Sequence, residues 1–412
     1  MKKTLALTTA LILTSAPLVC APSHAAPVLG MGATTTRVAE GSLLPPKDSK
    51  QLIVDGKKMY AGFKGLNGAP SVVKSTDGGL TWGNASTLDR SGEAPRIAVA
   101  IDTHYPGKKI VCAIWANAGS LKYSYYTDRP TGAGWSPAVS VSGDINVPEE
   151  SPVIAAAPDG SIHIFLTDYT NNYYLYANTA DGTFIGPTSV QSEWGNYPNS
   201  RDYAIATDST NNVYVADTHD DQKTGSVLFL HKKAPGNGWL IIGNESHPYI
   251  DRTDANFTVS NHLSLAVYDA NNMYIAYKKD PSSGTPVSQI WLAATSNGSV
   301  QNPHWALNPV APKKTTYGTM PSVAVNARKI LSVAGFYDAW GPGTAHVSIN
   351  KTSDYGATWS DSGTIDGSGY PSIAIDSAGK TCVLTVKFAP SLSGSLSERD
   401  TEVGPIHFTK EK

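Results

Sequence analysis

The sequence predicts an all-β fold, a single β-propeller built from four-stranded antiparallel blades. Three observations carry this prediction: a short apolar phrase that recurs along the chain, strand and turn signals in place of helical periodicity, and a composition typical of turn-rich β proteins. The 412 residues include 37 glycines, 27 prolines, 20 tyrosines and 9 tryptophans, while charged residues make up only 16%. This composition disfavours intrinsic disorder and coiled coil.

The recurring phrase joins a proline or polar residue to a short run of small and branched apolar residues. Its seven occurrences lie at 51–55, 94–99, 151–155, 202–208, 263–267, 320–325 and 370–376. A second apolar run follows the phrase after an Asp, Asn or Gly turn, and third and fourth runs complete most units. A repeat of about 45–60 residues with four strands is typical of a propeller blade.

Seven units predict seven blades, with six blades as the alternative. The last unit has two clear runs and a third at Pro405–Thr409, and then the chain stops. We expect a strand near residues 35–39 to supply the fourth, so that both chain ends share the last blade. Ring closure of this kind hides the strand edges. The expected domain organisation is therefore one propeller over residues 26–412.

The N-terminus has the pattern of a targeting segment. Lys2 and Lys3 precede an apolar run from Leu5 to Ala16, and small residues at 23–25 suit a cleavage site. This pattern predicts a secretory signal peptide over residues 1–25 and hence a secreted or periplasmic protein. No later stretch approaches about 18 consecutive apolar residues, so no membrane span is expected.

Charge and motif content exclude several classes of function. Lys and Arg number 32 and Asp and Glu number 34, a net charge of −2, whereas nucleic-acid binders usually carry a basic excess. After removal of the signal peptide only Cys112 and Cys382 remain, too few for a disulfide framework. No cofactor is predicted; the aspartate-rich run at 217–221 suggests calcium, but it lacks the EF-hand pattern. Nothing in the sequence indicates the oligomeric state.

Two predicted turns share one motif. Residues 75–82 read S-x-D-x-G-x-T-W, and residues 352–359 read the same with Thr in place of Ser. The motif resembles the Asp-box, or bacterial neuraminidase repeat (BNR), of sialidase-like propellers, and it implies membership of the sialidase superfamily. In that family the boxes are structural and lie away from the active face. The residues to which the resemblance assigns this role are Ser75, Asp77, Gly79, Trp82, Asp354, Gly356 and Trp359.

The same resemblance places function on the opposite face, in loops that enter the first strand of each unit and loops that join the second strand to the third. Arginines, carboxylates and aromatic residues gather in these loops, a mixture that suits a carbohydrate. Paired carboxylates there could act as general acid and base. The candidate catalytic residues are Glu150, Arg201, Asp202, His262, Tyr337 and Asp338. The candidate substrate-binding residues are Arg96, Trp194, Tyr197, Arg252 and Tyr370.

Two functions follow from these residues. One is a carbohydrate-active enzyme, either a polysaccharide lyase with His262 and a tyrosine such as Tyr337 as base and acid, or a glycoside hydrolase with Asp202 or Glu150 as acid. The other is a non-catalytic propeller that binds carbohydrate or protein. True exo-sialidase activity is not expected, because the Phe/Tyr-Arg-Ile-Pro motif of the sialidases is missing. The most similar segment of this sequence is Ala-Pro-Arg-Ile at 94–97.

Overall fold

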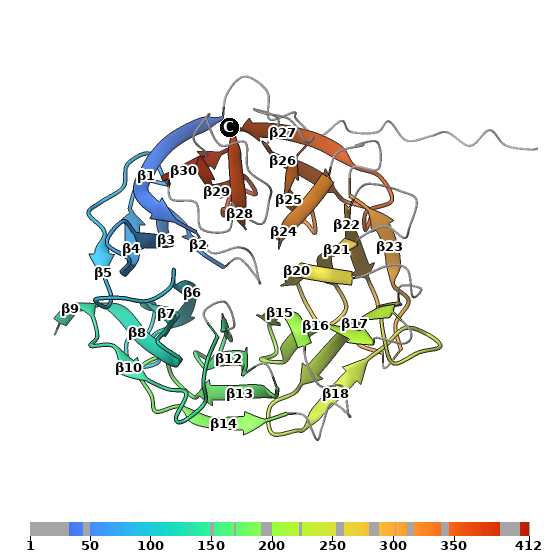
Figure 1. Cartoon of the computed structure of the whole chain (residues 1–412), viewed down its shortest axis with the longest axis horizontal. Helices are drawn as coiled ribbons and strands as arrows, with labels where there is room; N and C mark the ends of the chain where they lie inside the picture. Colours follow the sequence, from blue (N-terminus) through green and yellow to red (C-terminus); the bar gives the residue numbers. More distant parts are fainter. Residues whose placement is uncertain are drawn as a thin grey trace, which may run out of the picture.

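The chain folds as a β-propeller, in which antiparallel sheets stand around a common axis (Figure 1). The structure, a computed structural model, describes residues 33–43, 50–130, 132–148, 152–168, 170–190, 200–221, 225–252, 259–279, 288–300, 302–310, 317–338, 346–387 and 404–411. As the sequence predicts, the regular structure in these ranges is all β. Within them there is no helix whose length and apolar character would carry it across a bilayer. The predicted signal peptide at 1–25 lies outside the described residues.

Five sheets are separate blades of four antiparallel strands that follow one another from the axis to the rim, and each is named by its innermost strand. The β6 blade contains β6 (Arg96–Ile101), β7 (Lys109–Asn117), β8 (Ser120–Arg129) and β10 (Val139–Ser140), with β9 (Gly132–Trp135) beside β8. The β11 blade contains β11 (Val153–Ala156), β12 (Ile162–Thr167), β13 (Asn172–Ala177) and β14 (Ile185–Ser189). The β15 blade contains β15 (Ser200–Thr207), β16 (Val213–Asp221), β17 (Gly225–Lys233) and β18 (Trp239–Ile242), with β19 (Asp251–Arg252) beside β17. The β20 blade contains β20 (Val259–Val267), β21 (Met273–Lys279), β22 (Gln289–Thr295) and β23 (Ala306–Pro309). The β24 blade contains β24 (Tyr317–Val325), β25 (Leu331–Asp338), β26 (His346–Thr352) and β27 (Ser360–Asp366).

The sixth sheet has eight strands in two groups of four. The β28 group contains β28 (Ser368–Ile375), β29 (Thr381–Lys387), β30 (Gly404–Lys410) and β1 (Thr34–Ser42), and the β2 group contains β2 (Leu52–Asp55), β3 (Lys58–Gly65), β4 (Pro70–Ser75) and β5 (Ser86–Thr87). Strand β1 pairs with β30 over seven residue pairs but with β3 over only two. The sequence predicts separate sheets, whereas here two groups are joined, because Gly41 lets β1 continue onto β3. A Cβ at Gly41 would collide with the carbonyl oxygen of Lys64.

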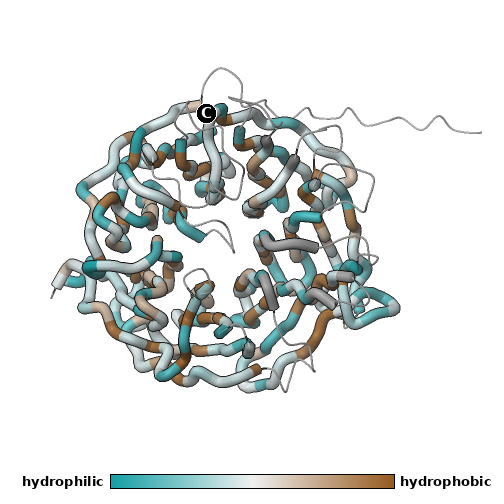
Figure 2. Tube along the Cα trace, in the orientation of Figure 1, coloured by the Kyte–Doolittle hydropathy of each residue, from teal (hydrophilic) through white to brown (hydrophobic). Residues whose placement is uncertain are grey.

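The core lies between neighbouring sheets rather than on one side of them. Ile205 and Val215 pack toward the β11 blade, in one cluster with Phe165, whereas Ala204 and Leu228 pack toward the β20 blade. Apolar segments accordingly recur in every sheet around the ring (Figure 2). Because both faces of a strand are buried, the middle strands read as continuous apolar runs instead of alternating ones.

Serine side chains connect the inner strands of successive sheets. On three inner strands, a serine hydroxyl accepts a hydrogen bond from a backbone N–H of the next inner strand around the ring. The bonds run from Val323 N to Ser264 Oγ at 3.2 Å, from Ile373 N to Ser322 Oγ at 3.1 Å, and from Leu52 N to Ser372 Oγ at 3.1 Å. They link β20, β24, β28 and β2 in series, so each of these serines supplies an acceptor for a buried backbone amide.

The axis of the ring is a narrow apolar channel of 340 Å³. Residues from seven inner strands, β2, β6, β11, β15, β20, β24 and β28, line it. Lys50 also reaches the channel, and its ammonium group donates a hydrogen bond to the carbonyl oxygen of Ile205 on the far side. Most of the side chains that line the channel are small or branched and apolar.

The β4–β5 and β26–β27 turns, which carry the shared sequence motif, have the same hydrogen bonds. In the first, Gly79 N donates to Ser75 Oγ at 2.9 Å, and Thr81 N donates to Asp77 Oδ1 at 2.9 Å. In the second, Gly356 N donates to Thr352 Oγ1 at 2.9 Å, and Thr358 N donates to Asp354 Oδ1 at 2.9 Å. The bonds from Thr81 lower the pKa of Asp77 to about 2. Both aspartates thus act as ionised acceptors for their own turn.

Glycine and tryptophan complete these two turns. Gly79 and Gly356 have φ angles of 89° and 86°, a conformation that side chains other than glycine rarely adopt. Trp82 packs edge-on against Phe408 with 5.5 Å between the ring centroids, and Trp359 packs on the cluster between the β20 and β24 blades. Both turns join the third strand of a group to the fourth, so antiparallel order puts them at the end of the ring opposite the starts of the inner strands.

Replacement of Ser322 by alanine should destabilise the fold by about 1–3 kcal/mol, because the buried amide of Ile373 loses its acceptor. The free energy of unfolding from urea titrations would measure the loss. Ser377→Ala is the matched control, since Ser377 is exposed in a turn at the other end of β28. Equal unfolding free energies for the two variants would show that the Ser322 bond contributes nothing.

Candidate functional site

The starts of four consecutive inner strands are irregular at the same place. Register shifts lie between Ser200 and Asp202, Ser260 and Leu263, Thr319 and Ser322, and Gly369 and Ser372. Antiparallel order gathers these strand starts on one end of the ring, called the entry face from here on. Met320 and Tyr370 have φ angles of 55° and 53°, which residues with a side chain seldom adopt. Bulges redirect side chains and are frequent next to active sites, so the entry face is the candidate functional site.

Several residues expected at the site fall in these bulges. Arg201 and Asp202 occupy the bulge of β15, His262 that of β20, and Tyr370 that of β28. The Asp202 carboxyl group is completely buried, Tyr370 is also buried, and His262 is half-buried. Of Arg201 and Asp338 only the backbone is described. Glu150, Trp194 and Tyr197 lie outside the described residues.

His262 bridges two neighbouring blades. Its Nδ1 atom lies 3.2 Å from Thr319 Oγ1 on β24, so the imidazole is held at the junction of the β20 and β24 blades. Histidine is the side chain that most often accepts or donates a proton in catalysis. Its position in a bulge at this junction therefore makes His262 the best-placed candidate base among the described residues of the entry face.

Tyr337 lies deeper than the sequence suggests. It is the register partner of Gly318, next to Thr319, but only 2% of its surface is exposed. Its ring stacks on His346 with 5.8 Å between centroids and 17° between planes. Burial raises the pKa of Tyr337 above its usual value, so the phenol stays protonated at neutral pH. It has the proton that a general acid needs, but contact with a glycan requires the side chains around it to move.

An Asp–His–His cluster in the β15 blade joins two residues of the aspartate-rich run at 217–221 to His231, which the sequence analysis did not connect with them. His219 Nε2 lies 2.5 Å from Asp217 Oδ2, and His231 Nε2 lies 2.9 Å from Asp217 Oδ1. All three side chains are buried. Burial opposes ionisation of Asp217, but the attraction of the two histidines is stronger and holds the pKa of the carboxyl group well below its usual range. The cluster therefore keeps a carboxylate inside the protein.

Strand geometry contains the signal that would have found this cluster. Asp217 and His219 are two residues apart on β16, so their side chains share one face of the sheet. His231 on β17 pairs with Val215, directly beside Asp217 on that face. The sequence shows the alternation, but only the register between β16 and β17 brings the second histidine to the carboxylate.

Arg96 occupies a position where other units have serine. It follows the proline of its recurring phrase as Ser322 and Ser372 follow theirs, and it begins inner strand β6. Only 2% of its surface is exposed. Burying an arginine at the start of an inner strand costs free energy unless the guanidinium group is paired. Buried charged groups of this kind are more typical of functional sites than of residues that only maintain the repeat.

Arg252 lies farther from the axis than the sequence suggests. Strand β19 pairs with the third strand of its blade, through Val227 and Leu228, and the Arg252 side chain is exposed there. Its neighbour Asp251 accepts hydrogen bonds from the Tyr277 hydroxyl at 2.7 Å and from Lys279 Nζ at 2.9 Å. This segment thus joins the β15 and β20 blades on the rim side of the entry face.

The described part of the chain contains no group of three or more His, Cys, Asp or Glu side chains arranged to hold a metal ion. Cys112 and Cys382 are both free and buried. Burial raises the pKa of each thiol to about 12. At neutral pH both are therefore protonated and act as small apolar side chains.

Comparison with known proteins supports the fold. The chain matches no protein-family model and no curated protein sequence. Among solved structures it is similar to an ulvan lyase of a new polysaccharide lyase family, PL25, with a TM-score of 0.60, 12% identity, and coverage of 85% of this chain and 91% of that one. The same lyase bound to -[GlcA(1-4)Rha3S]- gives a TM-score of 0.59. The polysaccharide lyase Uly1 is similar with a TM-score of 0.58, 9% identity, and coverage of 91% of this chain and 92% of that one. At these identities the likeness shows a shared fold.

Replacement of Asp217 by asparagine should lower the free energy of unfolding at neutral pH by about 3 kcal/mol, because two buried histidines lose their carboxylate partner. The pKa of Asp217 is lower in the folded protein than its ordinary value of 3.8, so its stabilisation is present above about pH 4 and disappears as the pH falls further. Urea titrations at pH 7 and pH 3 would show a difference between wild type and variant that shrinks at the lower pH. Asp366→Asn, at an exposed position of β27, is the control.

Proposed function

We propose that this chain is a carbohydrate-active enzyme that binds a glycan at the entry face and cleaves it by β-elimination, as a polysaccharide lyase. The single observation that carries the proposal is the row of bulges at the starts of β15, β20, β24 and β28, which brings His262 and Tyr370 to one end of the ring and has the backbone of Arg201 in the same row. The similarity to two polysaccharide lyases of the same fold supports the proposal.

The proposed chemistry acts on a uronic acid residue within the polymer. Arg201 pairs with the uronate carboxylate, which makes the proton on C5 easier to remove. The His262 imidazole accepts that proton, and the electron pair of the C–H bond forms a double bond between C4 and C5. The C4–O bond breaks at the same time, and its oxygen leaves with a proton from Tyr337 or from solvent. The products are a new chain end and an unsaturated uronate.

Glycoside hydrolysis is the second candidate. The complete burial of Asp202 beside the bulge of β15 favours it, because a carboxyl group in such a place can be kept for proton transfer. Asp202 or Glu150 is the acid in that case, and a second carboxylate activates water or attacks the sugar. The two reactions differ in their products, since only elimination leaves a carbon–carbon double bond.

The finer features of the protein belong to the same proposal. We count seven blades, because seven inner strands line the axial channel and the two-pair contact of β1 with β3 divides the eight-stranded sheet into two. The two equivalent turns around Asp77 and Asp354 support the interpretation as Asp-boxes and a relationship to the sialidase superfamily. We further propose one propeller domain over 26–412, secretion through the signal peptide at 1–25, and catalysis without a cofactor.

Incubation with uronic-acid polysaccharides should produce a rise in ultraviolet absorbance from the new double bond, with oligosaccharides that mass spectrometry identifies as unsaturated. Neutral glycans and sialosides serve as the comparison panel, each with and without a chelator. Water incorporated into the product instead of a double bond would establish the hydrolase. Glycan retained without any product would make the chain a binding propeller and overturn the enzymatic proposal.

Replacement of His262 by asparagine should lower kcat by about 10²–10⁴-fold, the usual contribution of a general base. His304→Asn is the matched control, because His304 is 69% exposed on the loop between β22 and β23. The two variants should have the same thermal unfolding temperature. Equal turnover by both would remove His262 from the mechanism.

Replacement of Arg201 by alanine should weaken turnover of the acidic polymer by raising KM and lowering kcat together, since the arginine holds the carboxylate next to the reacting carbon. Arg328→Ala, an exposed position in the turn after β24, is the control. Tyr337→Phe tests the acid: a fall in kcat supports Tyr337, whereas unchanged turnover assigns the leaving-group proton to solvent.

A further inference from the structure

We propose a second carbohydrate-binding site, for a neutral sugar residue, in a cavity on the rim between the β6 and β11 blades. This rim cavity has a volume of 520 Å³ and lies between β8 and β10 on one side and the β13–β14 turn on the other. Its volume is within the ordinary range of about 300–1,000 Å³ for small-ligand sites. It contains none of the residues assigned to the entry face.

Aromatic rings form the floor and one wall of the rim cavity. Tyr123 and Tyr125 come from β8, and Phe184 comes from the β13–β14 turn of the next blade. The Tyr123 ring packs edge-on against Phe184 with 4.8 Å between centroids and lies 6.3 Å from the Tyr125 ring. Tyr125 and Phe184 are both half-exposed. Two accessible rings that meet at a third can cover the apolar faces of a pyranose.

Hydroxyl groups and the apolar side chain of Val139 complete the lining. Ser140 and Thr183 are exposed at the edge of the cavity, and Val139 on β10 is 50% exposed beside them. The Tyr125 hydroxyl makes no hydrogen bond to any residue in the described part of the chain. The cavity therefore presents hydrogen-bonding groups next to accessible apolar surface. A sugar residue has the matching combination of hydroxyl groups and apolar ring faces.

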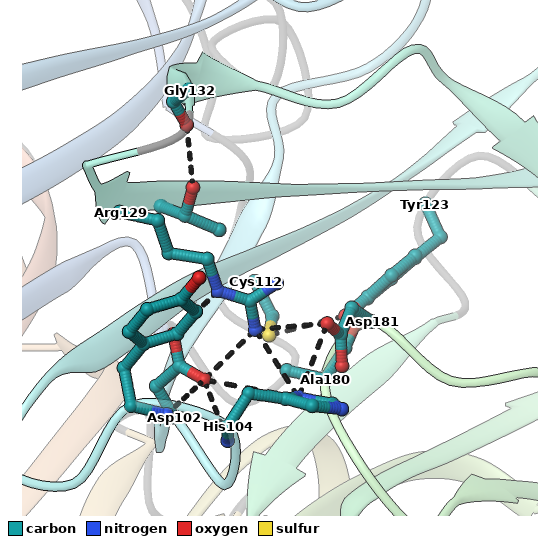
Figure 3. A network of polar contacts seen from close by, with 10 residues as sticks. Asp102, His104, Cys112, Tyr123, Arg129, Gly132, Ala180 and Asp181 are labelled. Atoms are coloured by element: carbon teal, nitrogen blue, oxygen red, sulfur yellow. Dashed lines mark hydrogen bonds and ion pairs between the residues drawn. The ribbon is translucent and has the colours of Figure 1, made fainter.

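Asp181, the one carboxylate among the described residues of the cavity lining, is held in place by an arginine. Asp181 Oδ2 lies 2.8 Å from Arg129 Nη2, and the same guanidinium group binds Asp102 at 2.7 and 2.8 Å (Figure 3). Burial opposes ionisation of Asp181, but hydrogen bonds from Arg129 and Thr179 and the positive charge of Arg129 together outweigh it and lower the pKa of the carboxyl group. Asp181 thus stays an ionised acceptor in a fixed position.

The charge of the lining selects a neutral ligand. No lysine or arginine is among the described residues that line the rim cavity, and Arg129, which binds Asp181 there, is shared by two carboxylates. A uronate or sulfate group placed there would meet Asp181 without a compensating charge. The site therefore suits a neutral hexose or pentose residue, in contrast to the acidic residue proposed for the entry face.

Binding to neutral methyl glycosides and neutral polysaccharides tests the site. Saturation-transfer NMR with methyl glucoside, galactoside, mannoside and xyloside should show transfer to at least one sugar, and a soluble neutral polysaccharide in a native gel should retard the protein. Phe184→Leu and Tyr125→Ala should each weaken binding about tenfold or more, because each removes a contacting aromatic ring. Leu240→Ala, which removes a residue 63% exposed elsewhere on the rim, should leave binding unchanged.

Three results would overturn the rim site: no binding of any neutral sugar by the wild type, binding that survives in the Phe184→Leu and Tyr125→Ala variants, or preferential binding of acidic sugars that these variants weaken. Phe184→Leu keeps an apolar side chain of similar size, and Tyr125→Phe adds a variant that loses only the hydroxyl, so a folding defect would not hide the answer. Turnover of soluble substrates at the entry face should be equal in all variants. The rim site and the enzymatic proposal can therefore fail independently.

Discussion

The antiparallel pairing of β1 with β30 is the interaction on which the ring depends. These strands come from opposite ends of the chain, and their seven residue pairs close the last sheet. Without them β30 would expose an open edge, and the β28 group would lack its outermost strand. Because β1 then continues past Gly41 onto β3, the closing contact also joins two groups into one sheet.

The two ends of the ring are built on different principles. At one end the turns are regular, and ionised aspartates such as Asp77 serve the backbone of their own turns. At the entry face four inner strands are bulged, and buried ionic groups accompany them, including Arg96 and the Asp217 cluster. Buried charges and positive φ angles cost free energy wherever they occur, and the regular packing between blades offsets that cost.

The two proposed glycan sites differ in charge and in rigidity. The rim cavity rests on regular strands and on an arginine that ties two blades together through Asp102 and Asp181. The entry face instead uses bulged strand starts around His262.

The sequence alone determined the all-β propeller architecture, because apolar runs, turn residues and the repeat are local patterns that one strand and its turns impose. It also directed attention to Arg201, Asp202 and His262, since polar residues before an inner strand must lie at its start. The depth of Tyr337, the displacement of Arg252 toward the rim, the Asp217 cluster and the rim cavity depended on the tertiary structure. Each of these arises from strand register or from packing between blades, which join residues far apart in the chain and leave no periodic trace in the sequence.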